Sequence, residues 1–214
     1  MSDAVRYHVE PPGARDRWGV LFRPILVIPH AMLVGGPFVG LGGSLRTGAL
    51  GLLAITSAFF DWVSILFTGH PIAGLQPFKR LYLNWRARVI AYACLLRDEY
   101  PPFGDGDYPA RLELPEEPET RDFKSVALRP LLLLPHLLVL FCLLVVAFLV
   151  CIGAWASIVF KGEMGENLWR FIRDVMAYAL RVEAYALLIH DRFPSFSLSA
   201  EPAAPESVEQ RATQ

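Results

Sequence analysis

Long apolar runs alternate with short polar segments along this chain. The longest run, residues 130–160, holds 31 residues without a formal charge, and His136 is its only ionisable group apart from thiols. Residues 24–45 are likewise uncharged, and residues 49–67 are interrupted only by Asp61. A run of about 18 or more apolar residues is typical of a membrane helix, because about 20 residues cross the hydrocarbon core. The pattern therefore predicts membrane helices in both halves of the chain.

Three sequence blocks occur twice and in the same order. The pairs are RPILVIPH (23–30) with RPLLLLPH (129–136), WVSILFTG (62–69) with WASIVFKG (155–162), and residues 88–103 with residues 181–196. The offset is 106 residues for the first pair and 93 for the other two, so the first copy contains 13 additional residues. We place these in the Gly-rich stretch 35–43. An internal repeat predicts repeated structural units.

Each copy contains the same series of predicted elements. A polar lead-in comes first, and the alternation of apolar and polar residues at 110–114 predicts a short strand there. The Arg-Pro pair then opens a long apolar helix, with its proline in the first turn, and the second proline, Pro29 or Pro135, kinks that helix. The apolar run ends at Phe-x-Gly. An amphipathic helix follows, over about residues 77–96 and 166–190, and prolines end it.

These elements predict an all-α membrane protein of two tandem pseudo-symmetric repeats. Each repeat is a long kinked hydrophobic helix plus an amphipathic helix, with a short extended polar lead-in, and the first helix is expected to break near the Gly-rich stretch. The expected organisation is repeat 1 (1–103), an acidic Pro-rich connector (104–121), repeat 2 (122–198) and a disordered tail (199–214). Because the first apolar run has an internal copy, it is not expected to be a removable signal peptide.

Composition supports a membrane location and argues against nucleic acid as a partner. The chain is 54% hydrophobic and 19% charged, with a mean hydropathy of +0.37, which is too apolar for an ordinary soluble domain of this length. A net charge of −1 gives no basis for binding nucleic acid. The three cysteines lie in apolar segments without metal-ligand spacing, so they are interpreted as buried free thiols.

The doubled motifs resemble a bacterial membrane family known as domain of unknown function 4389. They are Arg-Pro-x4-Pro-His, Trp-x-Ser-Ile-x-Phe-x-Gly and Arg-Val-x-Ala-Tyr-x-x-Leu-Leu-x-Asp-x-Tyr-Pro-Pro-Phe, and the likeness covers about residues 7 to 196 in two copies. The resemblance implies a bacterial membrane protein. It implies no reaction, cofactor or catalytic residue.

His30 and His136 are the sharpest candidates for chemistry. Each lies seven residues after an arginine, Arg23 or Arg129, so two helical turns place both side chains on one face. If the repeats pack about a pseudo-two-fold axis, the imidazoles approach one another, and paired imidazoles can bind haem or another transition metal. The alternative is that each imidazole bonds a carbonyl freed by proline or a polar group on a neighbouring helix, with no metal and no cofactor.

Arg88 and Arg181 occupy the apolar half of the amphipathic helices. Asp98 and Asp191 follow at the ends of these helices, and Asp61 lies opposite in the first repeat, so ion pairs between helices are expected. The alternative is a groove in which guanidinium groups bind lipid phosphate.

Four aromatic residues are interpreted as anchors at the membrane surface: Trp62, Trp155, Tyr100 and Phe193.

The sequence contains no nucleophile elbow, phosphate loop, paired catalytic carboxylates or His-Glu-x-x-His motif. We therefore expect a non-enzymatic accessory or scaffold protein that binds a membrane protein partner or a second copy of itself within the lipid bilayer. The alternatives are a small lipid-handling or transport protein, and a haem or metal subunit using His30 and His136. The positive-inside rule places the termini of a multi-pass protein on the cytoplasmic side of the bacterial inner membrane.

Overall fold

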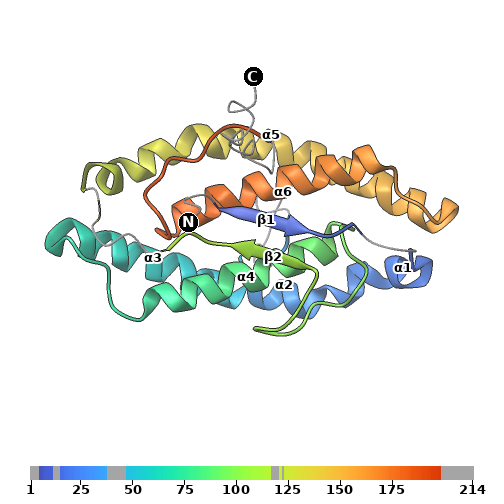
Figure 1. Cartoon of the computed structure of the whole chain (residues 1–214), viewed down its shortest axis with the longest axis horizontal. Coiled ribbons are helices and arrows are strands. Elements are labelled where there is room, and N and C mark those ends of the chain that lie inside the picture. The colour runs from blue at the N-terminus through green and yellow to red at the C-terminus, as the bar shows by residue number, and fades with distance from the viewer. Residues whose placement is uncertain (1–4, 12–14, 38–46, 117–120, 122, 199–214) are drawn as a thin grey trace, which may run out of the picture.

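The structure is a computed structural model that describes residues 5–11, 15–37, 47–116, 121 and 123–198 (Figure 1). The tail from 199 and residues 38–43 of the Gly-rich stretch lie outside the described residues. Within the described part the chain is mostly helical, as predicted. The elements are β1 (Arg6–Val9), α1 (Arg17–Leu26), α2 (Ile28–Val34), α3 (Gly48–Thr68), α4 (Leu75–Ala93), β2 (Ala110–Glu113), α5 (Phe123–Lys161) and α6 (Glu166–Ala186).

Two helices, α3 and α5, are long and apolar enough to cross a membrane. The pair α1–α2, which bends by 44°, makes a third candidate if it is taken as one broken span. The interval between Val34, where α2 ends, and Gly48, where α3 begins, holds 13 residues. This number equals the difference between the two repeat offsets. In the second repeat the corresponding segment is α5, a single helix of 39 residues.

The Arg-Pro pairs lie inside helices, which corrects the expectation that they open them. Helix α1 begins at Arg17 and α5 at Phe123, in each case seven residues before the proline, Pro24 or Pro130. Asp16 supplies the earlier start of α1, because its side chain accepts a hydrogen bond from the amide of Trp18 and so caps the helix. The bend predicted at the second proline occurs between α1 and α2, at Val27.

A proline inside a helix leaves the carbonyl four residues earlier without its amide partner. Pro24 frees the carbonyl of Val20, and Pro130 frees that of Val126. The indole Nε1 of Trp155 donates to the Val20 carbonyl at 3.0 Å, and the indole of Trp62 donates to the Val126 carbonyl at 2.9 Å. Each tryptophan therefore donates a hydrogen bond to the free carbonyl in the helix of the other repeat. We call this reciprocal pair of bonds the tryptophan exchange.

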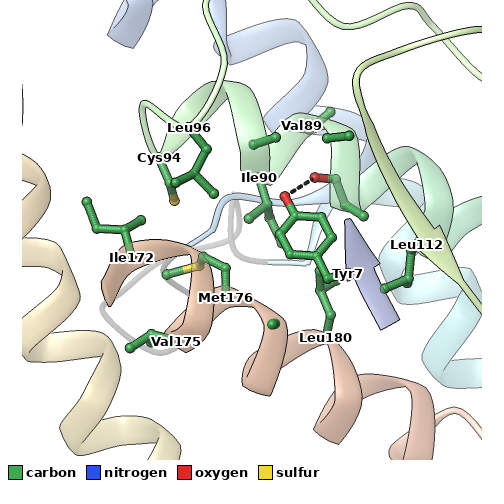
Figure 2. Packing of buried hydrophobic residues seen from close by; sticks show 14 of the residues in the cluster. Tyr7, Val89, Ile90, Cys94, Leu96, Leu112, Ile172, Val175, Met176 and Leu180 are labelled. Atoms are coloured by element: carbon green, nitrogen blue, oxygen red, sulfur yellow. Dashed lines mark hydrogen bonds between the residues drawn. The ribbon is translucent and has the colours of Figure 1, made fainter. Parts of the chain in front are cut away.

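Helices α4 and α6 form the central layer of the molecule. The antiparallel strands β1 and β2, with Tyr7 opposite Leu112, pack against α4 and α6, and Figure 1 shows them near the middle of the molecule, running along its long axis. Figure 2 shows Tyr7 and Leu112 directed at this layer, where the Tyr7 hydroxyl donates to the carbonyl of Ala87 at 2.9 Å. The strand predicted at 110–114 is confirmed. Helix α5 packs against α6, α1 and α3, and α3 also packs against α2 and α4.

The helix ends follow the predicted Phe-x-Gly signals. Gly69 after α3 and Gly162 after α5 have φ values of 77° and 82°. This left-handed conformation ends a helix and favours glycine, which has no Cβ to clash.

The tryptophan exchange predicts a specific pattern of coupling. Trp155→Phe removes the donor to the Val20 carbonyl and should lower the free energy of unfolding by about 1–3 kcal/mol, the usual cost of an unpaired buried polar group. In a Pro24→Ala background the restored amide occupies that carbonyl, so the same change should cost much less. Pro130→Ala is the matched control and should not reduce the cost. Chemical unfolding in detergent measures Trp155→Phe in the wild-type, Pro24→Ala and Pro130→Ala backgrounds, and equal losses in every background would contradict the exchange.

Candidate functional site

Helices α4 and α6 end in the same turn, built around a leucine with positive φ. Leu95 has a φ of 63° and Leu188 a φ of 59°, a region that non-glycine residues rarely occupy. The amide of Leu96 bonds the carbonyl of Ala91 at 2.9 Å, and Ile189 bonds Ala184 at 3.1 Å. These turns leave backbone carbonyls directed toward an arginine of the preceding apolar helix. A strained turn held in both repeats marks a position where the surrounding contacts hold the chain tightly.

The first of these arginines is Arg23 of α1. Its guanidinium donates to the carbonyls of Tyr92 and Arg97, each at 3.0 Å, and to Asp98 Oδ1 at 2.8 Å. The same group lies 4.5 Å from the centre of the Tyr92 ring. Arg15 donates to the same carboxylate oxygen at 2.9 Å. Two arginines thus converge on one aspartate at the end of α4.

The second cluster repeats these contacts at aligned positions. Arg129 of α5 donates to the carbonyls of Tyr185 and His190, at 3.0 and 3.2 Å, and to Asp191 Oδ1 at 2.8 Å. Its guanidinium lies 4.3 Å from the centre of the Tyr185 ring, and Arg121 bonds the same oxygen at 2.9 Å. We call these two sets the arginine–aspartate clusters. The predicted ion pairs between helices therefore involve Asp98 and Asp191.

Arg88 and Arg181 are not the partners of these aspartates, which corrects the ion pairs expected for them. Arg88 donates to the carbonyl of Gly104 at 2.9 Å and to Asp105 at 2.8 Å, and Arg181 donates to the carbonyl of Ser197. Both arginines therefore bind the loop that follows their own helix. The sequence alone could not assign the partners of the aspartates, because each repeat has two arginines that could reach the same helix end: Arg23 and Arg88 in the first repeat, Arg129 and Arg181 in the second.

His30 is enclosed by aromatic rings of the first repeat. Its Nδ1 accepts a hydrogen bond from the Trp85 indole at 3.1 Å. Phe103 stacks on the imidazole with ring centres 4.1 Å apart, and the centre of the Tyr100 ring lies 5.0 Å away. The fully buried imidazole has the expected polar partner on a neighbouring helix.

His136 has the same surroundings in the second repeat. Its Nδ1 lies 2.7 Å from the Tyr178 hydroxyl, Phe196 stacks on it at 4.2 Å, and the centre of the Phe193 ring lies 4.7 Å away. The rings that contact each histidine come from its own repeat, and the use of the two histidines for a haem stays a prediction. Within the described residues, no group of three or more His, Cys, Asp and Glu side chains is placed to hold a metal ion.

The four proposed membrane anchors take part in internal contacts. Trp62 and Trp155 are half-buried and donate to helix carbonyls, while Tyr100 and Phe193 are partly exposed and pack on the histidines. An anchoring role for their exposed edges stays a prediction.

Asp61 has a partner that sequence reasoning missed. Lys79 Nζ lies 2.6 Å from Asp61 Oδ2, and both side chains have no exposed surface. Asp61 also accepts from the amide of Ile72 at 2.8 Å, and Lys79 donates to the carbonyl of Leu187 at 2.9 Å. At the aligned positions of the second repeat stand Ala154 and Ile172, both fully buried. The simultaneous loss of both charges between the repeats is a signal that could have identified the pair.

Electrostatics outside the apolar helices follow from burial and from arginine neighbours. Burial and, to a smaller extent, the nearby Arg129 and Arg121 lower the pKa of His190 to about 4, while Asp191 opposes them. This histidine is therefore neutral at pH 7. Hydrogen bonding to Arg88 lowers the pKa of Asp105, and hydrogen bonding to Arg97 lowers that of Glu99, so both carboxylates are charged.

The described chain is thus a mainly helical protein with two apolar helices of membrane-spanning length and a doubled set of buried polar contacts. It belongs to the family described as Domain of unknown function (DUF4389), whose model matches residues 45–104 and 124–197. The family resemblance expected from the sequence is confirmed, with one matched segment in each half. No curated protein and no solved structure matches the chain.

The second repeat predicts how the buried ion pair can be replaced. Asp61→Ala alone leaves the Lys79 ammonium buried without its counter-ion and should destabilise the protein by about 3–5 kcal/mol. Adding Lys79→Ile reproduces the Ala154 and Ile172 arrangement and should recover most of this loss, because apolar replacements of a buried pair are often neutral. Thermal unfolding in detergent compares the three proteins. A double variant less stable than Asp61→Ala would contradict the interpretation.

Proposed function

We propose that this protein is a non-catalytic accessory or scaffold protein of a membrane, which holds a protein partner. The observation that carries the proposal is the use of the repeated side chains. In both halves the arginines, aspartates and histidines repeated in the sequence are bound to groups of the chain itself. Because these side chains bind other groups of the same chain, they support a structural role. This proposal takes the membrane to be a bacterial inner membrane, as expected from the sequence.

We further propose that the two repeats are related by an approximate two-fold axis. The tryptophan exchange supports it, because each repeat gives the other the same bond. The antiparallel pairing of β1 with β2 also supports it, because such an axis passes between two antiparallel strands. Interlocked repeats of this kind form a rigid platform, which suits a scaffold.

The exposed side chains of the two strands offer the partner a polar surface. This sheet face consists of His8, Arg111 and Glu113 in the strands and Glu10 directly after β1. His8 lies opposite Arg111 in the sheet, and its Nε2 lies 3.3 Å from the carboxylate of its diagonal neighbour Glu113, with about half of each of these two side chains exposed. Since these side chains have no role in the core, they are open to an external partner.

Purification of the full chain in mild detergent, followed by quantitative mass spectrometry, tests the scaffold role. We expect one membrane protein in stoichiometric amount with the wild type, and at least tenfold less of it with the double variant His8→Glu, Arg111→Glu. Arg170→Glu is the matched control, because Arg170 is an exposed cation on α6 away from the sheet, and it should retain the partner. A monodisperse protein without any companion would contradict the proposal.

A second candidate function, lipid handling, is favoured by an apolar pocket of 380 Å³ between α1 and α5. Its walls include Pro24, Phe148, Ile152 and Trp155, with Arg23 at one side. The volume lies within the usual range for small-ligand sites, about 300–1,000 Å³. An apolar lining formed by membrane-type helices fits one acyl chain of a phospholipid.

Native mass spectrometry of the detergent-purified protein tests this candidate. The wild type should retain one phospholipid per chain, and Ile152→Phe should lose it, because the larger ring fills the pocket. Phenylalanine already occupies the aligned position, as Phe59. Leu149→Phe is the control, since Leu149 is exposed on α5 and does not line the pocket. Equal lipid retention by the two variants would remove the candidate.

A further inference from the structure

We infer that the protein lies lengthwise along one face of a lipid bilayer, with α1–α2, α3 and α5 immersed in a single leaflet and the sheet face in water. This arrangement differs from the multi-pass topology expected from the apolar runs. Helix length and composition alone do not distinguish a helix that crosses a bilayer from one that lies along it. The placement of polar groups along the helices does.

The length of α5 is the first argument. Its uncharged part, Pro130 to Phe160, is about 45 Å long at about 1.5 Å per residue, whereas the hydrocarbon core is about 30 Å thick. A crossing that kept the whole of this part within the hydrocarbon core would require a tilt of about 50°, beyond the usual range of about 0–40°. A helix that lies along the bilayer meets no such limit.

The depth of the sheet is the decisive argument. Helix α6 runs antiparallel to α5, because Tyr185 contacts Arg129 and Tyr178 contacts His136. The same register places Leu180 and Met176 of α6 beside residues 134 and 138 of α5. Strand β1 contacts α6, and Tyr7, Leu180 and Met176 belong to one cluster of buried apolar residues (Figure 2). The sheet therefore lies at the level of residues 134–138, inside the uncharged part of α5.

On the other side, the sheet lies beside α4, and the same reasoning applies. Trp85 contacts His30 and Tyr92 contacts Arg23, which places Ala87, the partner of Tyr7, beside residue 28 of α2. Residue 28 also lies in an uncharged apolar run. If α5 and α1–α2 crossed the bilayer, both would place the sheet beside their uncharged runs and so against hydrocarbon.

The sheet cannot lie exposed to hydrocarbon. Its outward side chains are charged or ionisable, as given for the sheet face, and a two-stranded sheet leaves unpaired backbone groups on both outer edges. Backbone groups without partners cost several kcal/mol each in a bilayer, so open sheet edges do not face lipid. Water on the sheet side removes this conflict.

Most of the exposed large apolar side chains lie on α1, α2, α3 and α5. Among the described residues, α4 and α6 expose only Leu81 and Leu168 among their large apolar side chains. By contrast, α1, α2, α3 and α5 expose large apolar side chains at aligned positions of both repeats. These pairs are Phe22 with Leu128, Ile25 with Leu131, Met32 with Leu138, and Phe67 with Phe160. Both repeats therefore present the same side to lipid, opposite a central layer that is covered by the sheet.

Spin labels along one face of α5 test the arrangement. Leu131, Leu138 and Leu149 are spaced by whole turns and have similar exposed fractions, 63%, 68% and 62%. Single cysteines at these positions are labelled in the full chain after replacing Cys94, Cys142 and Cys151 by alanine, and the protein is placed in phosphatidylglycerol–phosphatidylethanolamine vesicles. Collision rates with oxygen and with a water-soluble nickel complex then give the depth of each label.

We expect the three labels to lie at one depth, within a few ångströms. A crossing helix would separate the first and last labels by about 27 Å along its axis, at about 1.5 Å per residue, with Leu138 deeper than at least one of them. That result would overturn the inference and would mean that protein, such as a second copy, covers the sheet.

Side-specific labelling provides an independent check. Cysteines at His8, Phe123 and Lys161 should react with a membrane-impermeant maleimide from the same side of sealed vesicles, because all three side chains are exposed. Reaction of Phe123→Cys and Lys161→Cys from opposite sides would overturn the inference. Neither experiment involves the protein partner, so the inference and the scaffold role can fail separately.

Discussion

The attachment of each apolar helix to the end of the helix that follows it is the constraint on which the rest of the structure depends. A buried guanidinium requires acceptors for its donors, and Arg23 and Arg129 find them in a carboxylate and two backbone carbonyls. Those carbonyls are available only because α4 and α6 end in a left-handed leucine turn. The strain of that turn is therefore offset by charge-assisted bonds that no other conformation of the segment supplies.

The arginine–aspartate clusters also position the aromatic side chains around the histidines. Once Arg23 lies on Asp98, the segment that follows α4 returns along the helix and brings Tyr100 and Phe103 onto His30. Arg88 then holds the next stretch through Gly104 and Asp105. Each polar bond thus orders the chain for the next contact, which explains why so many ionisable residues recur together in an apolar sequence.

Much of this architecture was predictable, and the failures have identifiable causes. The helices were predictable from the length of the apolar runs, the amphipathic periodicity and the Phe-x-Gly signals, because interactions between residues close in sequence determine where a helix forms and ends. The role of Arg-Pro was misjudged because the partner that makes an internal proline tolerable, a tryptophan, lies more than 60 residues away in sequence. Lys79 was missed for the same reason: its aspartate lies on another helix, and only comparison of the repeats reveals the pair.

The tryptophan exchange has a consequence for the origin of the chain. An isolated repeat contains a helix carbonyl without a donor and a tryptophan indole without an acceptor. If Trp62 reaches only the helix of the other repeat, these two groups cannot form a hydrogen bond within one repeat. Two copies of one repeat, however, satisfy each other completely. Such a homodimer, later fused head to tail through a connector, would account for a single chain whose halves are interdependent. The thirteen residues inserted in only one half would then date from after the fusion.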